Sequence, residues 1–170
     1  IMGRSMLRHN EVTIGRILAD GGYHTAMFGK WHLGDNAPMR PQDQGFLVSL
    51  IHKSGGITQT PDKPNSYFDP ILWRNGQRIK AEGYCTDVFF NAALEFIEKN
   101  QNEPFFVYLS TNAPHTPLQV DPRYSQPYEI DGLDATTAKI YGMISNIDEN
   151  FGNLLSRLEA LRLSERTVVI

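Results

Sequence analysis

The sequence has few cysteines, no long apolar run and little net charge, and each shortage argues against a class of protein. Cys85 is the only cysteine among 170 residues, so no internal disulfide can form. No apolar run is long enough to cross a lipid bilayer. The net charge of -3 gives no reason to expect a nucleic acid or an anionic membrane as a partner.

The composition is that of an ordinary globular domain. Hydrophobic residues make up 41% of the chain and charged residues 21%, and 170 residues are enough for one hydrophobic core. Both ends of the sequence look cut. The chain starts at Ile1 without a targeting segment, and it stops inside the β-branched run 167–170, which should continue as a strand. We therefore expect residues 1–170 to be a single partial domain, truncated at both ends.

The first third of the chain predicts a helix followed by a strand. Asn10 or Thr13 can cap the helix. Its apolar face would comprise Ile14, Ile17, Leu18 and Gly21. Two glycines then end it, and residues 23–29 alternate as a strand.

Residues 34–84 are rich in proline and predict an irregular functional insertion or lid. Within it, Asn75-Gly76 lies between two short apolar runs and predicts a hairpin over residues 71–80. His52 and Lys53 are interpreted as exposed polar loop residues without a role.

The second half predicts helices and strands in alternation. A helix opens at residues 84–86, with Thr86 as its cap, and closes near Lys99. The apolar run 105–110 predicts a strand buried on both faces, and residues 118–133 predict a polar loop. A long helix begins at Asp134 with a core stripe of Ile140, Met143, Ile144, Ile147, Phe151, Leu154, Leu155 and Leu158, and residues 167–170 predict a final strand. This order predicts an α/β fold, a three-layer α/β/α sandwich around a mostly parallel sheet.

Lys30, His32 and His115 form the candidate site. If the backbone stays extended, Lys30 and His32 point to the same side, where a cation and an imidazole suit a sulfate or phosphate. His115 lies in a loop stiffened by Pro114 and Pro117, directly after the strand 105–110. Ligands of open α/β sheets collect beyond the carboxyl ends of the strands, which is where both loops are expected.

Three segments in order resemble the type I sulfatases, which have a fold similar to alkaline phosphatase. They are residues 25–34, which contain Gly-Lys-Trp-His-Leu-Gly, then residues 84–87, and then residues 105–117. The resemblance implies hydrolysis of sulfate esters of aryl compounds or carbohydrates, with a formylglycine made from Cys or Ser and a calcium ion. A sulfated small molecule or glycan is the partner it implies, and it is compatible with a periplasmic or secreted location.

Carried over by motif, the resemblance assigns three roles. Lys30 would bind a sulfate oxygen, and His32 would contact the hydrated formylglycine and help to expel sulfate. His115 would bind the ester oxygen side and could assist the leaving group. Cationic and hydrogen-bonding groups at the non-bridging oxygens stabilise transition-state charge, and imidazole exchanges protons near neutral pH.

The sequence departs from the family pattern at the nucleophile and the metal ligands. The nucleophile motif, Cys or Ser followed by x-Pro-x-Arg, is absent from the sequence, and Cys85 is followed by Thr-Asp-Val-Phe. The acidic pairs that hold calcium are absent too, so we assign no metal ligand and expect no cofactor on this chain. The complete parent protein is expected to carry both groups, and the isolated chain to be inactive.

Two alternatives to a sulfatase stay open. One is a phosphodiesterase or phosphonate hydrolase of the same superfamily, and the other is a non-catalytic scaffold or binding protein that kept the fold. A zinc site built from His9, His24, His32, His52 and His115 is disfavoured, because their spacing matches no compact ligand motif.

Overall fold

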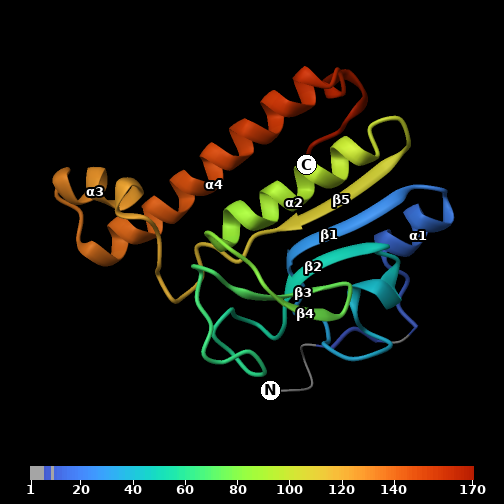
Figure 1. The fold of residues 1–170 in the computed structure, drawn as a ribbon, viewed down its shortest axis with the longest axis horizontal. Coiled ribbons are helices and arrows are strands. Elements are labelled where there is room, and N and C mark those ends of the chain that lie inside the picture. The colour runs from blue at the N-terminus through green and yellow to red at the C-terminus, as the bar shows by residue number, and fades with distance from the viewer. Residues whose placement is uncertain (1–5, 9) are drawn as a thin grey trace.

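A computed structural model describes residues 6–8 and 10–170, and it is built around one five-stranded sheet (Figure 1). The strand order is β4-β3-β2-β1-β5. The strands are β1 (His24–Lys30), β2 (Val48–His52), β3 (Ile71–Arg74), β4 (Gln77–Lys80) and β5 (Phe105–Ser110). Strand β1 pairs in parallel with both β2 and β5, and the β3–β4 hairpin extends the β2 edge in antiparallel fashion.

Helices lie on both sides of this sheet, which confirms the α/β class. They are α1 (Ile14–Asp20), α2 (Cys85–Lys99), α3 (Pro122–Ile130) and α4 (Ala135–Ala160), with 3-10 turns at Pro41–Gln44 and Ser164–Arg166. Figure 1 shows α2 and α4 together along one side of the sheet, and α1 beyond β1 on the other. Among the described residues, no helix combines the length and hydrophobicity that crossing a membrane requires.

Strand β1 is the centre of the fold, and its residues from Thr25 to Gly29 are all buried. Phe28 belongs to the cluster that packs against α2, whereas Met27 belongs to the cluster on the opposite face. Gly29 has φ +118°, and a Cβ atom there would lie 1.9 Å from the carbonyl oxygen of Ser110 in β5. Only glycine allows β1 and β5 to come this close at their carboxyl ends.

Several expected elements are confirmed. The hairpin turn has Asn75 and Gly76 at φ +49° and +82°, as a type I′ turn requires. Thr13 caps α1 by accepting from Arg16 N–H at 3.2 Å. Asp134 caps α4 by accepting from the backbone N–H groups that follow it.

The segment 34–84 contains more regular structure than expected. Strand β2 lies inside it and forms the second parallel strand of the sheet. The run of β2 contains only three apolar residues, Val48, Leu50 and Ile51, and the surrounding prolines and glycines favour a loop. The run nevertheless pairs in parallel with β1. The prediction of an irregular insertion is therefore wrong for this stretch, because tertiary pairing stabilises a strand that local composition disfavours.

Two further predictions of local structure are wrong. Helix α3 lies within the expected loop 118–133, where Asp121 accepts from Arg123 N–H at 2.9 Å and Pro122 opens the helix. Residues 167–170 form no strand, and Val168 and Ile170 are exposed. A β-branched run needs a neighbouring strand to pair with, and the described residues provide none there.

The predicted apolar faces are only partly buried. Ile14 and Ile17 are exposed, and α1 instead packs through Gly15 against Phe46. Strand β5 is only half buried, because it is the edge strand of this sheet.

The stripe of α4 is also only partly buried, since Met143, Leu154 and Leu158 are buried, whereas Ile144, Phe151 and Leu155 are exposed. Thr86 does not cap α2, because Tyr84 occupies the N-cap position without a side-chain bond.

Candidate functional site

The site lies at the carboxyl ends of the three parallel strands. Lys30 ends β1, and its register partner in β2 is His52. On the other side, the Ser110 hydroxyl of β5 donates to the Lys30 carbonyl at 2.7 Å. Lys30 is half-buried, and its backbone is fixed by both neighbouring strands rather than lying in a free loop.

His32 reaches this edge by a different geometry from the one expected. Its φ is +52°, so the backbone does not stay extended, and the expected side-by-side alternation with Lys30 is wrong. The exposed imidazole turns onto Gly55 in the loop after β2. A Cβ atom on Gly55 would lie 2.5 Å from Cε1 of His32, so the ring occupies the space that a side chain there would fill.

The loop after β5 holds His115 through hydrogen bonds from buried side chains. The Tyr67 hydroxyl donates to the His115 carbonyl at 2.8 Å, and Asn112 Nδ2 donates to that hydroxyl at 2.6 Å. Tyr67 is fully buried and Asn112 nearly so. His115 itself is exposed, and its Nδ1 lies 2.7 Å from the Thr116 carbonyl. Since a carbonyl can only accept, Nδ1 carries a proton, and in the neutral ring Nε2 is the free proton acceptor.

His52 is a site residue that the sequence interpretation missed. It is 1% exposed and lies at the end of β2, so the expectation of an exposed loop residue is wrong. Its Nδ1 lies 3.0 Å from the Lys53 carbonyl and therefore donates, while its buried Nε2 has no partner. The apolar run of β2 was the signal that would have placed it in the sheet.

Burial lowers the pKa of His52, and the charge of Lys30 lowers it further, against opposing effects of the Lys53 carbonyl and the Asn112 side chain. The imidazole is therefore neutral at neutral pH. His52 is the register partner of Lys30 at the carboxyl end of the β1–β2 pair. Separate hydrogen bonds join Asn112 through the Tyr67 hydroxyl to the His115 carbonyl.

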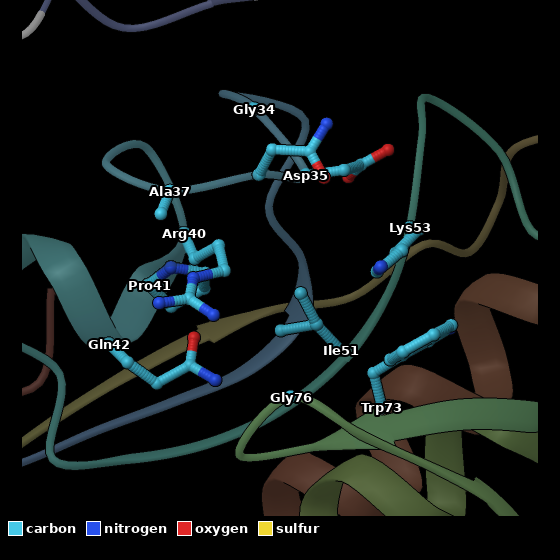
Figure 2. Close-up of a pocket in the computed structure, with 11 residues that line it drawn as sticks. Gly34, Asp35, Ala37, Arg40, Pro41, Gln42, Ile51, Lys53, Trp73 and Gly76 are labelled. Atoms are coloured by element: carbon cyan, nitrogen blue, oxygen red, sulfur yellow. The ribbon is translucent and has the colours of Figure 1, made fainter.

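A polar hollow of about 140 Å³ lies nearby but on the other face of β2. Figure 2 shows Lys53, Arg40 and Gln42 pointing into it, with Trp73 at its edge. The Lys53 ammonium lies 3.5 Å from the centroid of the Trp73 ring. Ile51 forms part of its wall, and successive strand residues point to opposite faces, so the hollow is separated from His52 and Lys30 by the strand itself.

The described residues do not provide a metal or nucleophile centre. Over residues 6–8 and 10–170, no three His, Cys, Asp or Glu side chains are grouped to hold a metal, and His9 lies outside this range. Cys85 is fully buried at the start of α2, and burial raises its pKa, so its thiol is unreactive. Calcium and formylglycine therefore enter no step assigned to these residues.

Lys30 ends β1, and the rings of His32 and His115 lie against Gly55 and Gly56 in the loop after β2. The carboxyl edge of a parallel sheet, where these residues lie, is where α/β proteins bind their ligands. The sulfatase family model matches residues 3–170, nearly the whole chain. The chain belongs to the sulfatase family.

Named relatives agree with this assignment. The chain is 32% identical over 125 residues to an N-acetylglucosamine-6-O-sulfatase of Bacteroides thetaiotaomicron, covering 71% of this chain and 20% of the relative. It is 27% identical over 183 residues to the N-acetylgalactosamine-6-sulfatase of Canis lupus familiaris, covering 94% and 31%. The chain thus spans no more than about a third of the length of these relatives.

Solved structures confirm the fold. The crystal structure of Ps i-CgsB superposes with a TM-score of 0.83 and 26% identity, over 95% of this chain and 39% of that one. The same protein in complex with k-i-k-neocarrahexaose superposes with a TM-score of 0.79 and 25% identity, over 94% and 40%. The alkaline-phosphatase-like sandwich expected from the resemblance is therefore the fold of this chain.

Proposed function

We propose that the complete protein hydrolyses sulfate esters, and that this chain supplies the part of the active site that binds sulfate and handles protons. The proposal is supported by the position of Lys30 at the end of β1 and by the approach of the His32 and His115 rings to the adjacent glycines Gly55 and Gly56. Family membership supports the reaction type. Formylglycine and calcium would come from parts of the protein outside residues 1–170, and the isolated chain is expected to be inactive.

Each residue takes the role its position allows. The Lys30 ammonium binds a non-bridging sulfate oxygen and stabilises the charge that develops there. His32, exposed and turned onto Gly55, is free to exchange a proton with the nucleophile side of the site. His115 faces the ester oxygen with Nε2, because its Nδ1–H is engaged by the Thr116 carbonyl. Nε2 donates to the leaving-group oxygen only when it carries a second proton, that is, from the imidazolium form of the ring.

A carbohydrate sulfate is the substrate class we propose. Two relatives are named as hexosamine sulfatases, and Ps i-CgsB was solved with a neocarrahexaose bound. The exposed position of His115 supports a bulky leaving group, since a sugar ring can approach Nε2 from solvent.

The test uses the complete protein, produced together with a formylglycine-generating system. Release of sulfate and of phosphate is compared on matched aryl esters and on sulfated oligosaccharides, for the wild type and for Lys30→Ala and His115→Ala. We expect sulfate release that falls at least about a hundredfold in both variants. Preferential phosphate release would instead assign a phosphohydrolase, and no release from any ester would favour a scaffold protein.

The matched control for Lys30→Ala is Lys63→Ala, because Lys63 is an exposed lysine in the loop between β2 and β3. The control should keep the wild-type rate. Equal losses in Lys30→Ala and Lys63→Ala would contradict the role of Lys30, since a general change in surface charge would then explain both.

A further inference from the structure

The imidazoles of His32 and His115 meet one dipeptide, Gly55-Gly56, which belongs to neither histidine loop. A Cβ atom on Gly55 would lie 2.5 Å from Cε1 and 2.6 Å from Nε2 of His32. A Cβ atom on Gly56 would lie 3.5 Å from Cε1 of His115. Because consecutive Cα atoms are about 3.8 Å apart, the two rings approach neighbouring points of a single backbone segment.

This backbone segment is held in place from both ends. The Ser54 N–H donates to both carboxylate oxygens of Asp35 at 3.1 Å. The Gly55 N–H donates to Gln59 Oε1 at 3.1 Å, and the Gln59 N–H donates to the Gly56 carbonyl at 3.0 Å. Both glycines are buried, whereas the two imidazoles are exposed. A close contact between a ring and this backbone is therefore relieved by movement of the exposed imidazole and not of the hydrogen-bonded backbone.

We propose that Gly55 is a positioning residue for His32. Because Gly55 has no side chain, the His32 imidazole can occupy the space beside it, and this determines the position of the ring in the active site. The inference rests on the proposed sulfatase function. Gly55 does not have the left-handed φ that only glycine prefers, so alanine fits its backbone. A methyl group at 2.5 Å from the ring is below any real contact distance, so it displaces the flexible end of His32 and leaves the fold intact.

Gly56 gives a matched control one residue away. A Cβ atom there would meet Gln59 Nε2 at 3.2 Å and the His115 ring at 3.5 Å, which are contacts that a small shift of Gln59 accommodates. In the complete protein, Gly55→Ala is expected to lower kcat/KM for sulfate release by about a hundredfold, as a displaced catalytic group does. Gly56→Ala is expected to lower kcat/KM for sulfate release only a few-fold. Both variants should keep a Tm near that of the wild type.

A double substitution separates positioning from a general loss. If Gly55 acts through His32, then Gly55→Ala in a His32→Ala background causes no further fall in kcat/KM. Losses that multiply independently in the double variant would overturn the proposal, because Gly55 would then act without His32. A Gly55→Ala protein that loses activity together with its Tm would overturn it as well.

Ring signals of the ¹⁵N-histidine-labelled complete protein give a readout that needs no activity. The His32 signals, identified by their loss in His32→Ala, are expected to shift in Gly55→Ala and to stay in place in Gly56→Ala. Unchanged His32 signals in Gly55→Ala would overturn the proposal even if sulfate release fell. A wild type that releases no sulfate, yet shows the shift, would reject the proposed function and retain the placement of His32 by Gly55.

Discussion

The two histidine loops at the strand ends are held by opposite means. The loop after β1 turns at His32 into the left-handed region, and its imidazole occupies a space left free by Gly55. The loop after β5 is held by added groups, because the buried Tyr67 hydroxyl donates to the His115 carbonyl and itself accepts from the Asn112 side-chain amide. One loop is therefore sensitive to an added methyl group, and the other to a deleted hydroxyl.

The largest expected effect comes from Gly29, where β1 and β5 converge beneath both loops. Gly29→Ala would place a Cβ atom 1.9 Å from the Ser110 carbonyl oxygen at φ +118°. Because this contact is with backbone in the centre of the sheet, we expect the free energy of unfolding to fall by about 3 kcal/mol or more. Chemical denaturation of the complete protein measures the change.

Gly22→Ala is the control for this substitution. Gly22 also has a positive φ, +86°, but a Cβ atom there meets nothing within 4 Å. It should therefore cost only the backbone strain, about 1–2 kcal/mol. A Gly29→Ala variant no less stable than Gly22→Ala would show that the β1–β5 contact can relax without cost.

The next effect concerns the loop after β5. Tyr67→Phe keeps the buried ring and removes the hydroxyl, so the His115 carbonyl loses a donor and Asn112 loses an acceptor. We expect a loss of about 1–3 kcal/mol in the free energy of unfolding, together with a fall in kcat/KM for sulfate release. The measurements are denaturation and steady-state kinetics on the same preparation.

Tyr84→Phe tests whether the fall in kcat/KM expected for Tyr67→Phe comes from the lost hydrogen bond to His115. Tyr84 is also buried, its ring stacks on Tyr67 at 5.7 Å, and its hydroxyl donates to the Gln119 carbonyl at 2.8 Å. It should lower stability by a similar amount and leave kcat/KM less affected. If kcat/KM falls equally in both variants, the rate depends on the fold of the loop as a whole and not on the hydrogen bond from Tyr67 to the His115 carbonyl.

The smallest effect is a dependence of stability on pH that comes from His52, the buried residue that pairs with Lys30 at the end of β2. Its folded-state pKa lies below the ordinary value of 6.5, mainly through burial. The unfolded chain therefore binds a proton first as the pH falls, so stability is complete above about pH 6.5 and decreases as the pH falls toward the folded-state pKa.

His52→Gln removes this titration, so its free energy of unfolding should change less between neutral pH and about pH 5 than that of the wild type. The exposed His24 provides the control, since His24→Gln removes a histidine from the start of β1 without touching the buried site. Parallel pH curves for His52→Gln and the wild type would mean that His52 does not titrate below its ordinary value in the folded protein.

Prediction from the sequence succeeded where a pattern was local. The Asn75-Gly76 turn, the Asp134 cap and the long helix α4 each depend on neighbouring residues, and each was confirmed. Residues Lys30, His32 and His115 were singled out by motif and by their place after strands. Their expected carboxyl-edge location is where the structure puts them, whereas their catalytic roles stay predictions.

Prediction failed where a residue's neighbours are distant along the chain. Strand β2 forms because β1 and β3 pair with it, and this pairing buries His52, which the local sequence describes as a loop residue. The half-exposed faces of β5 and α4 were expected to be buried, because an apolar pattern indicates which side is hydrophobic but not what covers it.

The sequence by itself determined the elements, the family resemblance and the identity of three candidate site residues, since these depend on short-range propensities and on spacing. Only the tertiary structure decided that Gly55 receives the His32 ring, that Tyr67 holds the His115 loop, and that His52 is buried opposite Lys30. The physical reason is that each of these contacts joins residues far apart in the chain. Their distances are set by sheet pairing and core packing, which no local pattern encodes.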